Sequence, residues 1–226
     1  MNLCLFDLDH TLLPLDSDHA WGDFLVRLGW VDEEHFKKRN DEFFELYQCG
    51  RLDIAEYIDF ATHAWRNRDE DSLWQAQDVF MREVIEPAVH PQALDLVHEH
   101  VSRGDLVAIV TATNEFVTRP IARMFGVEHL IAVQLETDEH GRYTGRIQGV
   151  PSFREGKVVR VEQWLAARQR EWADFQRLSF YSDSMNDLAL FERATDPVAT
   201  NPSPDLLDTA RARGWRIVHL FDNQTS

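Results

Sequence analysis

Short apolar runs that stop abruptly at polar residues recur along the chain, and each predicts a buried strand. Residues 3–6 form the first run, which ends at Asp7. Because the runs are apolar on both faces, they are typical of parallel strands that helices cover on both sides. Four later runs have the same character, namely residues 106–110, 178–181, 197–200 and 215–220.

Between these runs, apolar residues recur at helical spacing. Val97 and Val101 lie on one such stripe, which ends at Gly104. Strands that alternate with helices favour an α/β fold with a doubly wound, Rossmann-like parallel sheet. Four further helices are predicted over residues 115–125, 157–170, 184–193 and 204–213.

Two stretches depart from this alternation. Residues 17–89 contain no strand-like run but carry aromatic residues at helical spacing, so we expect three or four helices inserted after the first strand. Residues 131–148 alternate in polarity around a His-Gly pair, which predicts a β-hairpin. We therefore predict an α/β core domain from residues 1–16 and 90–226, and a helical cap domain from residues 17–89.

Composition narrows the classes of partner. The 226 residues include 23 Lys and Arg against 39 Asp and Glu, a formal net charge of −16. Nucleic acids and anionic membranes both bind clustered cations, so neither is an expected partner. No apolar run reaches about 18 residues and no basic segment opens the chain, so we expect a cytoplasmic protein. Cys4 and Cys49 lack the spacing of a disulfide framework or a zinc site, and we expect both to be buried.

Acidic side chains follow two of the predicted strands. Asp7 and Asp9 come after the first strand, and Asp183, Asn186 and Asp187 come after the third. Taken singly, each group is also compatible with a solvated turn or a helix N-cap. Together they would meet at the carboxyl edge of the sheet, where ligands of such folds bind. Their mutual repulsion and their oxygen-only chemistry predict a Mg²⁺ site.

Two further residues suit a phosphate group. Thr111 closes the second apolar run, just before a predicted helix whose free N–H groups could hold an anion. Lys157 lies at the start of another helix, where the dipole disfavours a cation unless an anion is near. An N-cap and a solvated lysine are the simpler alternatives for these two residues.

These segments resemble the four ordered motifs of the haloacid dehalogenase (HAD) superfamily. The match comprises residues 6–11, residues 109–113, Lys157 and residues 181–187. It is closest to the phosphoserine-phosphatase-like branch, subfamily IB, which includes histidinol-phosphatase-like members. The helical insertion lies where that branch has its cap. The resemblance implies an enzyme, a HAD-type phosphoric monoester hydrolase.

The resemblance also implies a mechanism. Asp7 would be the nucleophile that forms an aspartyl-phosphate, and Asp9 would be the general acid and base. Mg²⁺ would be held by Asp7, by the backbone carbonyl of Asp9 and by Asp183.

The remaining motif residues would support this chemistry. Thr111 and Lys157 would bind the transferring phosphate oxygens. Asn186 and Asp187 would not bind the phosphate themselves but would hold the metal site and Lys157 in position.

Substrate choice would lie in the cap. Asp16, Asp18 and His19 closely follow the first motif and would suit a cationic amine or an imidazole. The candidate substrates are histidinol phosphate and phosphoserine. Ala112 and Asp16 depart from the pattern of true phosphoserine phosphatases, which usually have Gly and Glu there. We expect the cap aromatics to form helix-packing core, namely Phe43, Phe44, Tyr47, Tyr57 and Phe60.

Two other functions remain open. A phosphotransferase or mutase would pass the aspartyl-phosphate to another hydroxyl, and a regulatory module would keep the fold without catalysis. The expected partner is a small phosphorylated metabolite, and the protein is expected to be a monomer or a homodimer.

Overall fold

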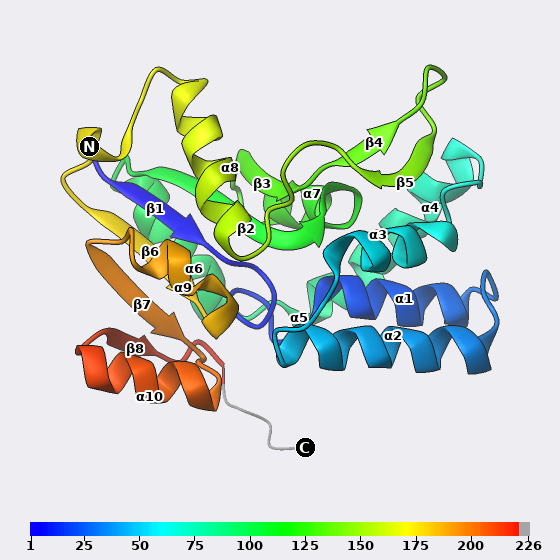
Figure 1. The fold of residues 1–226 in the computed structure, drawn as a ribbon, viewed down its shortest axis with the longest axis horizontal. Helices are drawn as coiled ribbons and strands as arrows, with labels where there is room; N and C mark the ends of the chain where they lie inside the picture. The colour runs from blue at the N-terminus through cyan, green and yellow to red at the C-terminus, as the bar shows by residue number, and fades with distance from the viewer. Residues whose placement is uncertain (222–226) are drawn as a thin grey trace.

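The computed structural model describes residues 1–221, and a six-stranded parallel sheet forms the core of one side of the molecule (Figure 1). The strand order is β3-β2-β1-β6-β7-β8, so the chain extends the sheet from β1 first in one direction and then in the other. This order confirms the predicted doubly wound α/β class. The strands are β1 (Leu3–Phe6), β2 (Leu106–Asn114), β3 (His129–Val133), β6 (Leu178–Ser182), β7 (Asp196–Thr200) and β8 (Arg216–Val218).

Helices cover both faces of the sheet. Phe6 packs in one apolar cluster with Val97 and Ile121, whereas Leu5 packs in a second cluster with Val161. Neighbouring residues of β1 thus point to opposite faces, which explains why the whole run is apolar. Within residues 1–221, no helix has the length and apolar character needed to cross a membrane. The helices beside the sheet are α6 (Pro91–Ser102), α7 (Glu115–Met124), α8 (Glu155–Ala166), η2 (Trp172–Asp174), η3 (Met185–Asp187), α9 (Leu188–Phe191) and α10 (Pro204–Arg213).

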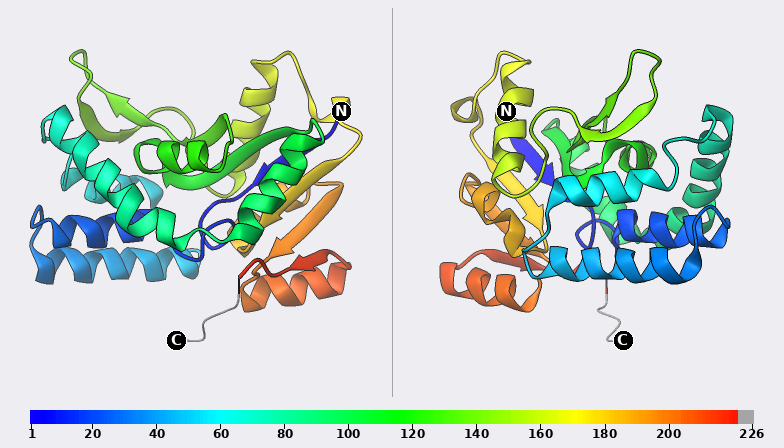
Figure 2. Two further views of the ribbon diagram at one scale, coloured as in Figure 1. Left: turned by 180° about the vertical axis from the view of Figure 1, so that it is seen from behind. Right: turned by 45° about the vertical axis from the view of Figure 1, so that its right-hand side comes forward.

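The segment between β1 and α6 folds as helices that lie to one side of the sheet (Figure 2). Four aspartates, Asp16, Asp32, Asp53 and Asp69, precede the first four helices, and each accepts backbone N–H bonds from the first turn. Caps of this kind stabilise a helix by about 1 kcal/mol each. The elements are α1 (Ser17–Arg27), α2 (Glu33–Gln48), α3 (Ile54–His63), α4 (Glu70–Phe80), the π-helical turn η1 (Met81–Ile85) and α5 (Glu86–Ala88).

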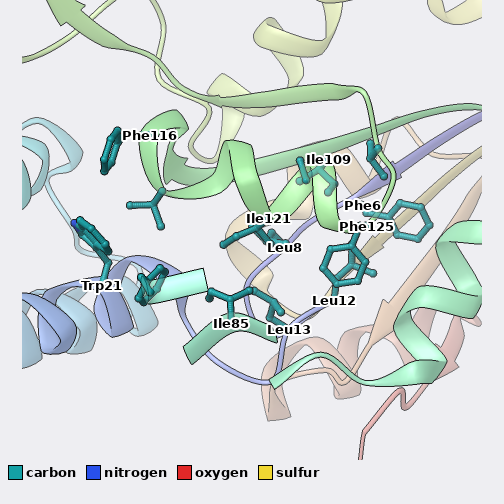
Figure 3. Packing of buried hydrophobic residues seen from close by; sticks show 14 of the residues in the cluster. Phe6, Leu8, Leu12, Leu13, Trp21, Ile85, Ile109, Phe116, Ile121 and Phe125 are labelled. Carbon is teal, nitrogen blue, oxygen red and sulfur yellow. The ribbon is translucent and has the colours of Figure 1, made fainter. Parts of the chain in front are cut away.

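The first apolar cluster continues from the sheet into the inserted helices (Figure 3). Phe6 and Ile109 come from β1 and β2, and Trp21 comes from α1. Trp21 meets Phe116 of α7 edge to face, with 5.8 Å between the ring centroids. The insertion and the sheet therefore share one apolar core.

The region 131–148 differs in part from the prediction. The expected antiparallel hairpin forms from β4 (Leu135–Thr137) and β5 (Tyr143–Ile147). Residues 131–133 belong instead to β3 of the main sheet, where Ile131 pairs with Val110. An apolar stretch of this length fits either location by pattern alone. β2 also extends to residue 114, beyond its predicted end at 110, and Asn114 pairs with Val133.

Smaller differences concern helix ends and one cysteine. The helix predicted over 157–170 ends at Ala166, and the one predicted over 184–193 divides into η3 and the short α9. Cys4 is buried as expected, but Cys49 is exposed. The predicted core range ends at residue 226, and its last five residues lie outside the described part of the chain.

Gly145 provides a test of how the hairpin packs on α3. Its φ is +87°, and a Cβ there would overlap Arg66, whose Nη1 donates to Asp59 Oδ1 at 2.6 Å. We expect Gly145→Ala to lower the free energy of unfolding in urea by about 2 kcal/mol, through backbone strain and displacement of Arg66. The matched control is Gly141→Ala, where φ is +76° and the space is open, with an expected loss of about 1 kcal/mol. Equal losses would contradict the contact.

Candidate active site

Two carboxylates from different strands come together at the carboxyl edge of the sheet. Asp7 directly follows β1, and its N–H donates to the carbonyl of Tyr181 in β6 at 2.9 Å. Asp183 follows β6. The hydroxyl of Thr11 lies 3.2 Å from Asp7 Oδ2 and 3.3 Å from Asp183 Oδ1, so the two acids share one donor. The parallel register of β1 and β6 thus produces the predicted meeting of acids.

Lys157 lies between two acids rather than in solvent. It is 1% exposed, and its Nζ donates to Asp7 Oδ1 and to Asp187 Oδ2, each at 2.7 Å. Burial alone would lower the pKa of Lys157, but the charges of Asp187 and Asp7 outweigh it and raise the pKa. The Ser182 hydroxyl also donates to Asp187 Oδ2, at 2.7 Å. Lys157 therefore stays an ammonium ion at the start of α8.

The preceding residue allows this placement. A Cβ on Gly156 would overlap the backbone carbonyl of Pro151, so only glycine lets the start of α8 lie so close to that loop.

The buried carboxylates of the site outnumber the one buried lysine that pairs with them. Burial raises the pKa of Asp7 to about 7 against the opposing effect of Lys157. Burial, together with the charges of Asp7 and Asp187, raises the pKa of Asp183 well above its usual value. A single ammonium cannot balance three carboxylates, so a further positive charge would stabilise the site.

The donor atoms suit a hard divalent cation. Asp7 and Asp183 offer carboxylate oxygens, the donors that Mg²⁺ prefers, and Mg²⁺ commonly uses one or two carboxylates and keeps several waters. Within residues 1–221, no three His, Cys, Asp or Glu side chains form a metal cage by themselves. A cation here would therefore need backbone oxygen and water as further ligands.

Asp9 is held by two hydrogen bonds. Its Oδ1 accepts from the backbone N–H of Ser17 at 2.8 Å, and its Oδ2 accepts from the Thr113 hydroxyl at 2.8 Å. Burial and the nearby charge of Asp16 raise the pKa of Asp9 to about 7. Thr113 lies in the second motif, but nothing in the pattern of that motif assigns it a role.

Thr111 is buried within β2 and does not close the strand, so that part of the prediction is wrong, whereas the next helix begins at Glu115 as predicted. The strand continues to Asn114, whose side chain caps α7 instead. Thr111 Oγ1 accepts from the N–H of Thr113 at 3.1 Å. The register pairs Phe6 with Ile109, so Thr111 lies near the same sheet edge as Asp7. Its role in binding phosphate stays a prediction.

Asn186 connects the core to the inserted helices. Its Nδ2 donates to the carbonyl of Tyr47 in α2 at 3.1 Å. The neighbouring Asp187 supports Lys157 as described, whereas a role of Asn186 in supporting the metal stays a prediction.

A narrow cavity separates Asp9 from the inserted helices. It measures about 30 Å³, room for one or two water molecules. Phe43, Phe44, Tyr47 and Tyr57 line it, so these four do more than pack helices together. Phe60 packs between helices as expected, with its ring centroid 5.0 Å from that of Phe43.

The three cap residues singled out from the sequence all line this cavity. Asp16 Oδ1 accepts from the N–H groups of Asp18 and His19, at 3.0 and 2.8 Å, and so caps α1. The His19 ring contacts Asp41 Oδ1 at 2.8 Å. Asp18 Oδ1 accepts from Asn114 Nδ2 at 3.1 Å. The predicted group is thus brought together beside Asp9.

Known proteins resemble the chain over nearly its full length. A histidinol-phosphatase of Neisseria meningitidis serogroup C is 39% identical over 219 residues, which cover 97% of this chain and 99% of that protein. A crystal structure of a protein with unknown function from Bordetella pertussis Tohama I is 52% identical, with a TM-score of 0.92, and covers 97% and 99% of the two chains. A substrate-bound phosphoserine phosphatase complex has a TM-score of 0.67 at 16% identity over 97% and 93%, a likeness of fold alone.

The family itself is also matched. Residues 4–192 fit the haloacid dehalogenase-like hydrolase family. The chain therefore belongs to the haloacid dehalogenase-like hydrolases and is an enzyme of the phosphatase type, as the order of its motifs predicted.

Proposed function

We propose that this protein hydrolyses the phosphomonoester of a small metabolite through an aspartyl-phosphate intermediate, with Mg²⁺ as cofactor. The observation that carries the proposal is the position of Asp7, which touches Lys157 through one carboxylate oxygen and Thr11 through the other. The contact with Lys157 neutralises the charge of Asp7, and Thr11 also contacts Asp183. A carboxylate in these surroundings is suited to attack an anionic phosphate.

In the first step, an oxygen of Asp7 attacks phosphorus while the bond from phosphorus to the ester oxygen breaks. Asp9 gives its proton to the departing alcohol. Lys157 and Thr111 hold the oxygens of the transferring group. The Ser17 N–H and the Thr113 hydroxyl keep the Asp9 carboxyl in one orientation.

In the second step, the ionised Asp9 takes a proton from water, and the water oxygen attacks phosphorus. The bond from phosphorus to Asp7 then breaks, which releases inorganic phosphate and restores both carboxyl groups. Asp7, Asp183 and the backbone carbonyl of Asp9 would hold Mg²⁺, which when bound supplies charge neutralisation.

Two substrates fit this proposal, histidinol phosphate and phosphoserine. The histidinol-phosphatase from Neisseria supports the first, because it is 39% identical over almost all of both chains. The phosphoserine phosphatase shares the fold at 16% identity and supports the second less. The cytoplasmic location and the monomeric or dimeric state stay predictions from the sequence.

Replacing the nucleophile tests the chemistry. We expect Asp7→Asn to reduce the hydrolysis of 4-nitrophenyl phosphate in Mg²⁺ by at least about 10³-fold, since an amide is a poor nucleophile. Chelation of Mg²⁺ with EDTA should abolish the wild-type rate, and added Mg²⁺ should restore it. Asp23→Asn, on the exposed side of α1, is the matched control and should keep wild-type turnover. Equal turnover by Asp7→Asn and wild type would refute the mechanism.

Replacing the buried cation tests the charge balance. We expect Lys157→Met to lower the free energy of unfolding at pH 7 by about 3 kcal/mol, because two buried carboxylates lose their partner. Chemical denaturation measures the change, and Lys37→Met on α2 is the control. A loss no greater than that of the control would mean that Lys157 does not neutralise these acids.

Added alcohols distinguish hydrolysis from phosphate transfer. With glycerol or ethanol in excess, we expect free phosphate to account for nearly all of the 4-nitrophenol released, because Asp9 is held in place to activate water. Phosphorus NMR identifies both products. A phosphorylated alcohol as the main product would make the protein a phosphotransferase.

A further inference from the structure

One carboxylate oxygen in the cavity beside Asp9 makes no hydrogen bond with any residue that the structure describes. Asp18 is 4% exposed, and its Oδ1 accepts from Asn114 Nδ2 at 3.1 Å. No donor within residues 1–221 makes a hydrogen bond with its Oδ2, although the Tyr57 hydroxyl is close enough to lower the pKa of Asp18. A buried carboxyl oxygen without a donor is costly unless something else binds it.

The neighbouring polar residues of the cavity are already engaged. Asp16 is partly exposed and caps α1, and the His19 ring contacts Asp41. Of the three cap residues predicted to face the substrate, Asp18 is therefore the one with a buried acceptor to spare.

Carboxylates outnumber basic side chains in the cavity. Asp9, Asp16 and Asp18 line it, its described lining residues include no Lys or Arg, and the His19 ring already contacts Asp41. Burial raises the pKa of Asp18 to about 8, and the charges of Asp16 and Asp9 add to the rise. A positively charged ligand beside Oδ2 would offset this cost, whereas a ligand carboxylate would meet three acids and no described cation.

Aromatic rings complete the wall. Phe44 and Tyr57 line the same cavity, and the Phe44 ring lies 5.0 Å from that of His19 between centroids. Aromatic faces attract cations and stack on planar rings. A carboxylate and aromatic rings in one small space favour a cationic nitrogen next to an unsaturated ring.

We propose that the Asp18 carboxylate binds the cationic nitrogen of the substrate, and that this cavity rejects phosphomonoesters that carry a carboxylate. The inference rests on the proposed phosphatase function and refines it. It selects an amine of the histidinol phosphate type. It excludes phosphoserine, because no Lys or Arg among the described lining residues would pair with the carboxylate of that substrate.

Three substrates separate these charges in steady-state assays with Mg²⁺. L-Histidinol phosphate carries an amine and a ring, L-phosphoserine carries an amine and a carboxylate, and 4-nitrophenyl phosphate carries neither charge. We expect the wild type to favour histidinol phosphate over phosphoserine by about 100-fold or more in kcat/KM. Similar values for the two amine substrates would overturn the proposal.

Asp18→Asn keeps the shape of the residue and removes its charge. We expect it to raise KM for histidinol phosphate about tenfold or more, and at least fivefold more than it raises KM for 4-nitrophenyl phosphate. Asp95→Asn, at an exposed position on α6, is the control that keeps both values. An equal effect of Asp18→Asn on the two substrates would give Asp18 a structural role only.

Calorimetry on the wild type gives a second readout that avoids the variant. Histidinol should bind at least about tenfold more tightly than serine, and equal binding would also overturn the proposal.

Failure of the underlying function is distinguishable from failure of this inference. If the wild type hydrolyses none of the three esters in Mg²⁺, the proposed phosphatase activity is wrong. If it hydrolyses 4-nitrophenyl phosphate but does not prefer the cationic ester, only the role of Asp18 is wrong.

Discussion

The burial of acidic groups around one ammonium ion is the constraint on which the site depends. Asp7 and Asp187 both accept hydrogen bonds from Lys157. The Thr11 hydroxyl contacts both Asp7 and Asp183. Removing carboxylates from water is expensive, so each must be protonated, paired or bound to a cation. The parallel sheet brings these groups together at one edge, and the glycine before Lys157 allows its helix to start within reach. The fold therefore creates an excess of negative charge, which a bound cation would balance in the proposed chemistry.

The architecture was predictable from the sequence because β1, β2 and β6 are apolar on both faces and end at polar residues. The proximity of Asp7 and Asp183 could be predicted by the same reasoning, because parallel strands end at a common edge of the sheet. The confirmed hairpin was visible as alternating polarity. In each case the sequence pattern and the physical requirement coincide.

The misses share a cause, which is that pattern does not determine pairing. Residues 131–133 were assigned to the hairpin because a short apolar run does not show which strand it joins. The strand predicted to end near Thr111 continues along β3 to Asn114, although the next helix begins at Glu115 as predicted. Tyr47 and Tyr57 line the cavity, although the sequence predicts them as helix-packing core. Helical spacing shows that aromatic residues share one face of a helix, but it does not show what that face contacts. Such assignments need the three-dimensional arrangement of the helices.

The hydrogen bond from Asn186 to the carbonyl of Tyr47 acts as a latch between the two parts of the molecule. Asn186 is the chain neighbour of Asp187, which holds Lys157, while Tyr47 belongs to a helix that closes the cavity. Tyr47 therefore cannot move away from this turn without breaking the hydrogen bond. A single amide thus couples the wall of the cavity to the turn that positions the buried ammonium.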